Sequence, residues 1–84
     1  MLSLRSEVKI FLATEVIDMR KSIDGLLSII VAEHNPKPQN GDLYIFRNKN
    51  NDKVKCLFWH HNGFALCYKR LESGKFKINK YPDK

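Results

Sequence analysis

The side chains in this chain best suited to bind a metal ion are two cysteines and three histidines: Cys56, Cys67, His34, His60 and His61. Zinc fingers need close pairs of cysteines and of histidines, and these residues lack that spacing. We interpret both cysteines as buried small hydrophobic residues. The sequence therefore predicts no metal site and no cofactor. A disulfide is not expected either, because the predicted strand register places the two cysteines diagonally, beyond comfortable reach.

Carboxylates could support a second chemistry, since metal-dependent nucleases and transposases hold divalent cations with several of them. The chain has nine Asp and Glu residues. Asp18 is predicted to cap a helix, Asp24 falls nearly on the opposite side of that helix, and Asp52 lies in a predicted turn. No pair converges, and the four scattered glycines form no phosphate-binding loop. We therefore predict that the chain is not an enzyme, with a metal-dependent nuclease as the least favoured alternative.

Lysine and arginine side chains offer a third chemistry, the binding of a polyanion. Residues 43–84 hold ten Lys or Arg against three acids, whereas residues 1–42 hold five against six. In the second half the basic residues alternate with aromatic and aliphatic ones, as from Lys53 to Trp59. Basic side chains neutralise phosphates, and aromatic rings can stack on unpaired bases. This pattern favours nucleic acid as the partner.

The elements that must position these side chains follow from hydrophobic periodicity. Successive side chains in residues 7–14 alternate between two faces, with Val8, Ile10 and Leu12 on the same one. This period of two predicts a strand. Ile23, Leu26 and Ile30 share one stripe with their neighbours, which predicts a helix from about residue 19 to 33 with Asp18 as its N-cap. After a turn-rich connector, strands are predicted at 42–47, 53–60 and 64–71, with or without a short last strand at 76–78.

These elements predict an α+β fold, with one α-helix packed on a curved, mostly antiparallel sheet of four to five strands in the order β-α-β-β-β. Gly25 inside the helix is interpreted as a sign of close packing on the sheet, with close approach of a partner as the alternative.

The 84 residues are expected to form a single domain with a thin core. No apolar run could cross a bilayer and no signal peptide is recognisable, so we expect a cytoplasmic protein with reduced thiols.

An Asn-Gly pair at residues 62–63 predicts a two-residue hairpin turn and sets the strand register. On that register Lys55 lies opposite Arg70, and both share one face of the sheet with Trp59 and Tyr68. The other face is the more apolar one and is predicted to pack on the helix. In an alternative interpretation, the aromatic residues of the first face form a second layer of core, covered by the long basic stems.

The basic-aromatic face is the predicted nucleic-acid site. Its cations would contact phosphates, its two exposed aromatic rings would stack or pack, and two cations at the start of the helix would add to an anion site. The predicted binding residues are Arg20, Lys21, Arg47, Lys49, Lys53, Lys55, Trp59, Tyr68, Arg70, Lys75 and Lys77. Lys69 is not among them, because the same register points it at the core.

Five sequence blocks carry a resemblance to a known family. They are residues 18–26 (DMRKSIDGL), 41–48 (GDLYIFRN), 55–59 (KCLFW), 62–64 (NGF) and 68–76 (YKRLESGKF). Their order and spacing resemble the TnpB accessory proteins of the insertion-sequence family sixty-six, products of the second open reading frame. The chain departs from that pattern at His60 and His61, where the family usually has acidic or small polar residues. It also ends soon after Phe76, whereas relatives continue into a further C-terminal segment.

The resemblance implies a bacterial mobile-element protein that assists transposition beside a separate, larger transposase. Combined with the basic-aromatic face, it predicts a non-catalytic factor that binds DNA at the ends of the element. The alternative is an adaptor that binds the transposase through the same face, with Trp59, Tyr68 and Arg70 as anchors. No oligomeric state follows from the sequence.

Overall fold

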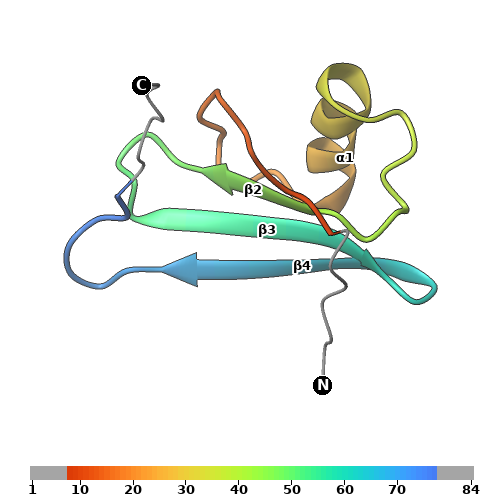
Figure 1. The fold of residues 1–84 in the computed structure, drawn as a ribbon. Coiled ribbons are helices and arrows are strands. Elements are labelled where there is room, and N and C mark those ends of the chain that lie inside the picture. Colours follow the sequence, from red (N-terminus) through yellow and green to blue (C-terminus); the bar gives the residue numbers. More distant parts are fainter. Residues whose placement is uncertain (1–7, 78–84) are drawn as a thin grey trace, which may run out of the picture.

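The computed structural model describes residues 8–77 as one helix and four strands (Figure 1). In chain order these are β1 (Ile10–Leu12), α1 (Ile23–Glu33), β2 (Leu43–Arg47), β3 (Lys53–His60) and β4 (Gly63–Arg70). The predicted α+β class and element order are confirmed. β1 is shorter than the strand predicted there. Residues 76–77 are not in a strand, and the remainder of the predicted last strand lies outside the described residues.

The four strands form one mixed sheet in the order β1-β2-β3-β4, so neighbours in the sequence are neighbours in the sheet. β1 and β2 are parallel, with α1 between them in the chain, and β2, β3 and β4 are antiparallel. Leu43 and Ala13 extend the β1–β2 pairing by donating their N–H groups to the carbonyls of Lys9 and Ile45. The buried carboxylate of Asp42 accepts the N–H of Lys9 and closes the start of this pair.

The hydrophobic core lies between α1 and one face of the sheet. Its fully covered members are Leu26 and Ile30 of the helix, and Tyr44, Phe46 and Leu57 of the sheet. Burial of these side chains is the main favourable term in folding. The predicted apolar stripe of the helix is thereby confirmed at its centre. Within residues 8–77, α1 is the one helix, and it is too short to cross a membrane.

The prediction of which sheet face meets the helix is wrong. Leu57 and Lys55 lie on the covered face together with Tyr44 and Phe46, because β2 pairs Tyr44 with Leu57 and Phe46 with Lys55. The large side chains of β2 therefore decide which face is buried, and the β3–β4 hairpin alone does not contain that information. Lys69 lies on the opposite face and is exposed, so no lysine points from β4 into the core.

The β3–β4 hairpin turns one residue earlier than predicted, with His61 and Asn62 as its loop. His61 takes up the left-handed conformation, with a φ of 61°. Lys55 consequently lies opposite Tyr68 instead of Arg70. Partners are shifted by two residues, and a shift of two leaves the membership of each face unchanged.

Contacts at both ends of the hairpin favour the observed register. Near the loop, Trp59 lies opposite Phe64, and their rings meet edge to face with centroids 4.9 Å apart. At the far end, the N–H of Leu71 donates to the carbonyl of Asp52, which continues the same ladder beyond β4. These contacts outweigh the local turn preference of the Asn-Gly pair.

The start of the helix also differs from the prediction. Ser22 is the N-cap residue and makes no side-chain cap hydrogen bond. Asp18 does not cap the helix but accepts a hydrogen bond from the N–H of Arg20 at 2.9 Å. The carboxylate is thereby used in a turn before α1, which is why the helix begins about four residues later than predicted.

Gly25 is the glycine inside α1, and its neighbour is not the sheet. A Cβ atom added at this position would meet the Cβ and Cγ atoms of Lys21 at 3.4 Å. The side chain of Lys21, just before the helix, therefore lies beside this position. The predicted packing of Gly25 on the sheet is wrong, because a lysine stem occupies that space.

The turn between β2 and β3 is built by the side chain of Asn48. Its Oδ1 accepts the N–H groups of Asp52 and Lys53, and its Nδ2 donates to the Asp52 carboxylate at 2.6 Å. The chain that follows β4 returns to this turn, where the N–H of Phe76 donates to the carbonyl of Asn51 at 2.7 Å. The turn and the segment after β4 thus lie together at one end of the sheet (Figure 1).

Candidate nucleic-acid interface

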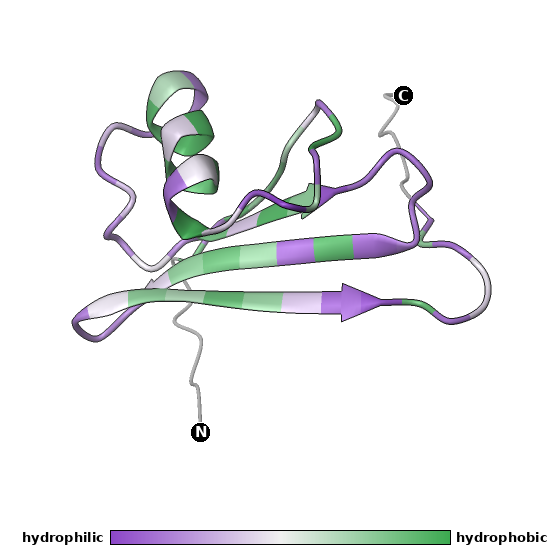
Figure 2. Cartoon of the chain, turned by 180° about the vertical axis from the view of Figure 1, so that it is seen from behind, coloured by the Kyte–Doolittle hydropathy of each residue, from purple (hydrophilic) through white to green (hydrophobic). Residues whose placement is uncertain are grey.

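Seven basic side chains gather at one end of the sheet, which we call the basic end. They come from the end of β2, the turn after it, the start of β3, the end of β4 and the segment that follows. The members are Arg47, Lys49, Lys53, Lys69, Arg70, Lys75 and Lys77. Residues 8–77 hold twelve Lys and Arg, so more than half of them lie here. Figure 2 shows this end as the hydrophilic end of β3 and β4.

Two acids lie among these cations, and each is engaged by a neighbour. The Nε of Arg70 donates to the Glu72 carboxylate at 2.8 Å, and Glu72 raises the pKa of the Arg70 guanidinium. Lys53 Nζ lies 3.6 Å from the Asp52 carboxylate, whose pKa is lowered mainly by the hydrogen bond from Asn48. The Arg70–Glu72 pair is solvent-exposed and therefore weak, so a phosphate can take the place of the Glu72 carboxylate.

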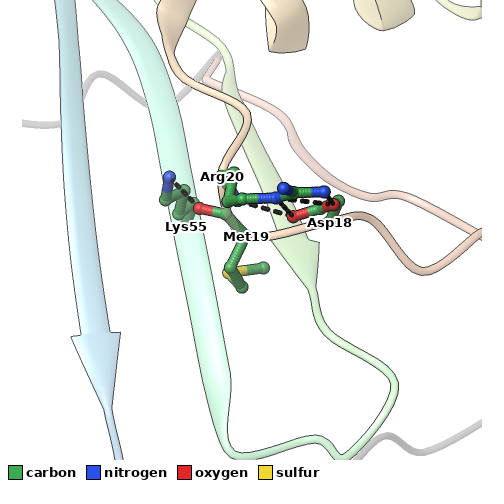
Figure 3. Close-up of polar contacts among 4 residues, drawn as sticks. All are labelled: Asp18, Met19, Arg20 and Lys55. Carbon is green, nitrogen blue, oxygen red and sulfur yellow. Dashed lines mark hydrogen bonds and ion pairs between the residues drawn. The ribbon is translucent and has the colours of Figure 1, made fainter.

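Lys55 is buried, so the prediction that it lies on an exposed basic face is wrong. Its Nζ donates to the backbone carbonyls of Met19 at 2.7 Å and of Lys21 at 2.6 Å. Figure 3 shows the first of these contacts reaching across from β3. The same Nζ lies 5.2 Å from the centroid of the Tyr68 ring. Because a buried ammonium group needs such partners, Lys55 anchors the segment before α1 to the sheet.

The anchored segment presents Arg20 and Lys21 to solvent. Arg20 donates through Nε and Nη2 to the Asp18 carboxylate, at 2.7 Å for the shortest contact (Figure 3). This interaction lowers the pKa of the Asp18 carboxyl to about 2. Arg20 and Lys21 lie just before the first helical turn, whereas the sequence placed them inside the helix.

Two other predicted residues lie away from Tyr68. Arg47 is on the sheet face turned away from α1, where its Nη1 donates to the Asn51 side chain at 2.9 Å. Its Nε is buried and has no hydrogen-bond partner among the described residues. Trp59 is half-buried against Phe64 near the β3–β4 loop, at the opposite end of the sheet from the basic end. Of the two predicted stacking residues, Tyr68 is therefore the one beside the basic end.

The face of the sheet turned away from α1, which we call the open face, is apolar in its middle. No helix or strand in residues 8–77 covers it (Figures 1 and 2). Ile10 is 63% exposed and Leu12 is 40% exposed. Their register neighbours Leu43 and Ile45 belong to the same face. The part of this face that β3 and β4 contribute was predicted to meet the helix, and it is uncovered because the large side chains of β2 pack on the helix from the other face.

Cys56 and Cys67 lie directly opposite each other on the open face. Both are free thiols; Cys56 is partly covered and Cys67 is exposed. Burial, followed by the neighbouring Cys67, raises the pKa of the Cys56 thiol. The prediction of two buried, diagonally placed cysteines is therefore wrong, because both the packed face and the register differ from those expected.

Sites for a metal ion or a small ligand have little support in the described part of the chain. In residues 8–77, no three His, Cys, Asp or Glu side chains come together in a way that could hold a metal ion. A hollow of about 220 Å³ lies beside Phe11, His34 and Tyr44. Most ligand sites measure roughly 300–1,000 Å³, so this hollow is small by comparison.

The sequence match to a known family extends over nearly the whole chain. Residues 8–84 match the family model described as IS66 Orf2 like protein. The chain belongs to this family. The resemblance drawn from the five sequence blocks is thereby confirmed, and the IS66 Orf2-like chain is a protein of an insertion sequence, a mobile element that moves by transposition.

Two curated relatives come from the bacterium Sinorhizobium fredii. "Uncharacterized protein y4jC" is 36% identical over 69 residues, which are 82% of this chain and 59% of that protein. "Uncharacterized protein y4hO" is 29% identical over 76 residues, which are 90% of this chain and 66% of that protein. The IS66 Orf2-like chain thus spans about three-fifths to two-thirds of these relatives. No solved structure matches it.

Sequence reasoning missed two features of the basic end of this IS66 Orf2-like protein. Lys69 was assigned to the core, yet it is exposed and lies next to Arg70. Asn48 was given no role from the sequence, yet its side chain organises the turn that carries Lys49. The alternation of β2 could have placed Lys69 correctly. Because Tyr44 and Phe46 are the large side chains that face the helix, the residues of β3 and β4 on their face are covered, and Lys69 lies on the other face.

Proposed function

We propose that this IS66 Orf2-like protein is a non-catalytic accessory factor of transposition that binds DNA through its basic end. One observation carries the proposal. Segments that are far apart in the sequence, around residues 47–53 and 69–77, bring seven cations to one end of the sheet against two acids. A concentrated positive field of this kind attracts the phosphate backbone and steers its approach. The action would take place in the bacterial cytoplasm.

The exposure of the basic end supports a role in phosphate contact. Lys49, Lys69, Lys75 and Lys77 are exposed, and within residues 8–77 no ion pair holds their ammonium groups. Each can therefore approach a phosphate and release a condensed counterion. The geometry of residues 8–77 favours contact with the backbone of DNA, since no helix of this part of the chain projects from the basic end to enter a groove.

A salt titration with charge-reversal variants tests the proposal. Binding to duplex DNA from the element ends would be measured by fluorescence anisotropy for the wild type and for Lys49→Glu combined with Lys75→Glu. The slope of log K against log salt is negative. If both lysines contact phosphates, its magnitude decreases by about 2 in the double variant, at roughly 0.9 per lost contact. No binding of the wild type at low salt would end the proposal.

A matched control separates position from net charge. Lys9 and Lys37 are exposed and lie outside the basic end. Lys9→Glu combined with Lys37→Glu changes the net charge by the same amount as the first double variant. We expect this control to keep nearly the wild-type slope. Equal losses in the two double variants would contradict a site at the basic end.

The proposal of a non-catalytic role rests on the placement of the acids. Residues 8–77 contain no assembled group of three candidate metal ligands, which a metal-dependent nuclease would need. Incubation of the protein with supercoiled plasmid and Mg²⁺ or Mn²⁺ tests this point. We expect the plasmid to stay intact, and cleavage that follows the purified protein through gel filtration would contradict the proposal.

The open face supports a second candidate function, an adaptor that binds the transposase of the element. Exposed apolar surface of this kind marks interaction sites, and Ile10 and Leu12 form its rim. A pull-down of the transposase would then survive nuclease treatment and high salt, and Ile10→Ser with Leu12→Ser would abolish it. Loss of the transposase after nuclease treatment would show a DNA bridge and contradict the adaptor.

A further inference from the structure

Among the Phe, Trp and Tyr side chains of residues 8–77, Tyr68 is the one that is mostly exposed, at 54%. The other Phe, Trp and Tyr side chains of the described chain are buried or half-buried. Exposing a ring of this size forfeits the burial that usually stabilises it. Tyr68 lies on β4, an edge strand of the sheet. No strand of residues 8–77 pairs with the outer edge of β4, so a ligand can approach the ring from that edge.

The Tyr68 ring is ordered by its contact with the Lys55 ammonium group. Lys55 lies directly opposite it on β3, with Nζ 5.2 Å from the ring centroid. That ammonium is itself held by the carbonyls of Met19 and Lys21. A ring ordered before binding loses less entropy when a ligand stacks on it.

Cations lie next to the ring on the same face. Arg70 is two residues further along β4, about 7 Å away at the usual strand rise. Lys53 lies opposite Arg70 on β3. The Arg70 side chain is 60% exposed and its partner Glu72 is 77% exposed, so the pair is open to exchange with a phosphate. An exposed aromatic ring thus adjoins two cationic side chains.

We infer that this site binds nucleic acid as a single strand, with one unpaired base stacked on Tyr68 and a neighbouring phosphate on Arg70 and Lys53. The inference rests on the proposed function and specifies its ligand. In a duplex both faces of each base are covered by neighbouring bases, so the exposed Tyr68 ring would find no free base face on which to stack. Stacking between bases and aromatic side chains tolerates any sequence, because every base has a π-face.

The test compares one oligonucleotide of mixed sequence as a single strand and as a duplex, by anisotropy at fixed low salt. The variants are Tyr68→Ala and Tyr68→Phe, with Val31→Ala on α1 as the matched control of an exposed apolar residue. Loss of one base stack weakens single-strand binding by about tenfold or more. We expect that loss for Tyr68→Ala on the single strand alone, and binding within about twofold of wild type for Tyr68→Phe and Val31→Ala.

The outcomes separate this inference from the proposed function. If charge reversal at the basic end weakens binding while Tyr68→Ala affects neither ligand, the DNA-binding proposal stands and the single-strand inference is overturned. Equal weakening of single strand and duplex by Tyr68→Ala also overturns it. If Tyr68→Ala instead abolishes capture of the transposase with DNA binding intact, Tyr68 is a protein contact. Absence of any DNA binding at low salt removes both proposals, and urea titration checks that each variant is folded.

Discussion

Lys55 is one of two lysines on β3, and its sequence context favours phosphate binding. Its burial and its two carbonyl partners make it an anchor for the segment before α1 instead. The neighbouring residues show why the sequence did not reveal this. Lys53 and Lys55 alternate in the same way, but only Lys55 lies opposite Phe46, under the chain that enters the helix. The difference depends on contacts more than 30 residues apart in the chain.

Replacing this anchor should destabilise the protein. Lys55→Met leaves the carbonyls of Met19 and Lys21 without their donor, and we expect the free energy of unfolding to fall by about 2 kcal/mol in a urea titration. Amide hydrogen exchange at residues 19–21 should accelerate as well. Lys53→Met is the control, because its ammonium has only a 3.6 Å ion pair, and its effect should stay within about 0.5 kcal/mol. Equal stability of Lys55→Met and wild type would contradict the anchor.

Asp18 provides a second check at the scale of single residues. Its carboxyl has a pKa of about 2 against an ordinary value of 3.8, because it accepts hydrogen bonds from Arg20. A pKa lowered by folding means that the contribution to stability is complete above pH 3.8 and is lost as the pH falls toward 2. Carboxyl-detected NMR should show the low midpoint in the wild type and a midpoint near the ordinary value in Arg20→Gln. A wild-type midpoint near 3.8 would disprove the contact.

At the scale of elements, the sequence predicts what is local and fails on what is not. The alternation of each strand and the stripe formed by Leu26 and Ile30 are properties of short segments, and they predicted the order of elements correctly. The covered face depends on how β2 pairs with β3, which no single segment contains. The turn at His61 prevails over the Asn-Gly preference because Trp59 packs on Phe64.

The two cysteines allow a direct test of the observed register. Directly opposite residues in antiparallel strands have Cα atoms about 4.5–5.5 Å apart, which lies within the range of roughly 4.4–6.8 Å that a disulfide spans. Oxidised glutathione should therefore convert Cys56 and Cys67 to an intramolecular disulfide, seen by mass spectrometry as the loss of two hydrogens. The Cys67→Ser variant should give at most a glutathione adduct. Failure of the wild type to form the bridge would favour the diagonal arrangement.

Gly25 and Gly41 should respond in opposite ways to alanine. Gly25 is within α1, and an added Cβ would meet only the flexible stem of Lys21 at ordinary contact distance. Gly25→Ala should raise the free energy of unfolding by about 0.5–1 kcal/mol through helix propensity. Gly41 has a φ of +90°, so Gly41→Ala should be strained and lower it. Thermal unfolding measures both, and a loss in Gly25→Ala would show that the lysine stem cannot move.

For the whole molecule, the charge asymmetry between the halves of the sequence was a correct sign of a basic region. Its location was not predicted, because the cations collect at one end of the sheet and not on one face. Arg47 and Lys69 lie on the open face, whereas Lys53 and Arg70 lie on the other. The shared end follows from the turn at Asn48 and from the return of the chain after β4. The clustering of these cations therefore depends on the topology of the sheet, which no single segment of the sequence contains.

The cations of the basic end should also repel one another in the absence of a ligand. Raising the salt concentration shortens the screening length from about 30 Å at 0.01 M to about 8 Å at 0.15 M, which relieves this repulsion. We expect the urea midpoint of the wild type to rise with sodium chloride over that range. In Lys49→Glu combined with Lys75→Glu, the rise should be smaller. A midpoint that falls with salt would indicate that the ion pairs of Asp52 and Glu72 dominate instead.

The sheet order β1-β2-β3-β4 has a consequence for the way in which the chain folds. The β2–β3 and β3–β4 pairings close short loops, whereas Ile10 of β1 must find Leu43 across 33 residues. Closing the longer loop costs more entropy before any contact is gained. The meander of β2, β3 and β4 should therefore assemble first and serve as the template on which β1 and α1 dock. Substitutions in the meander should slow folding, and substitutions in β1 should mainly accelerate unfolding.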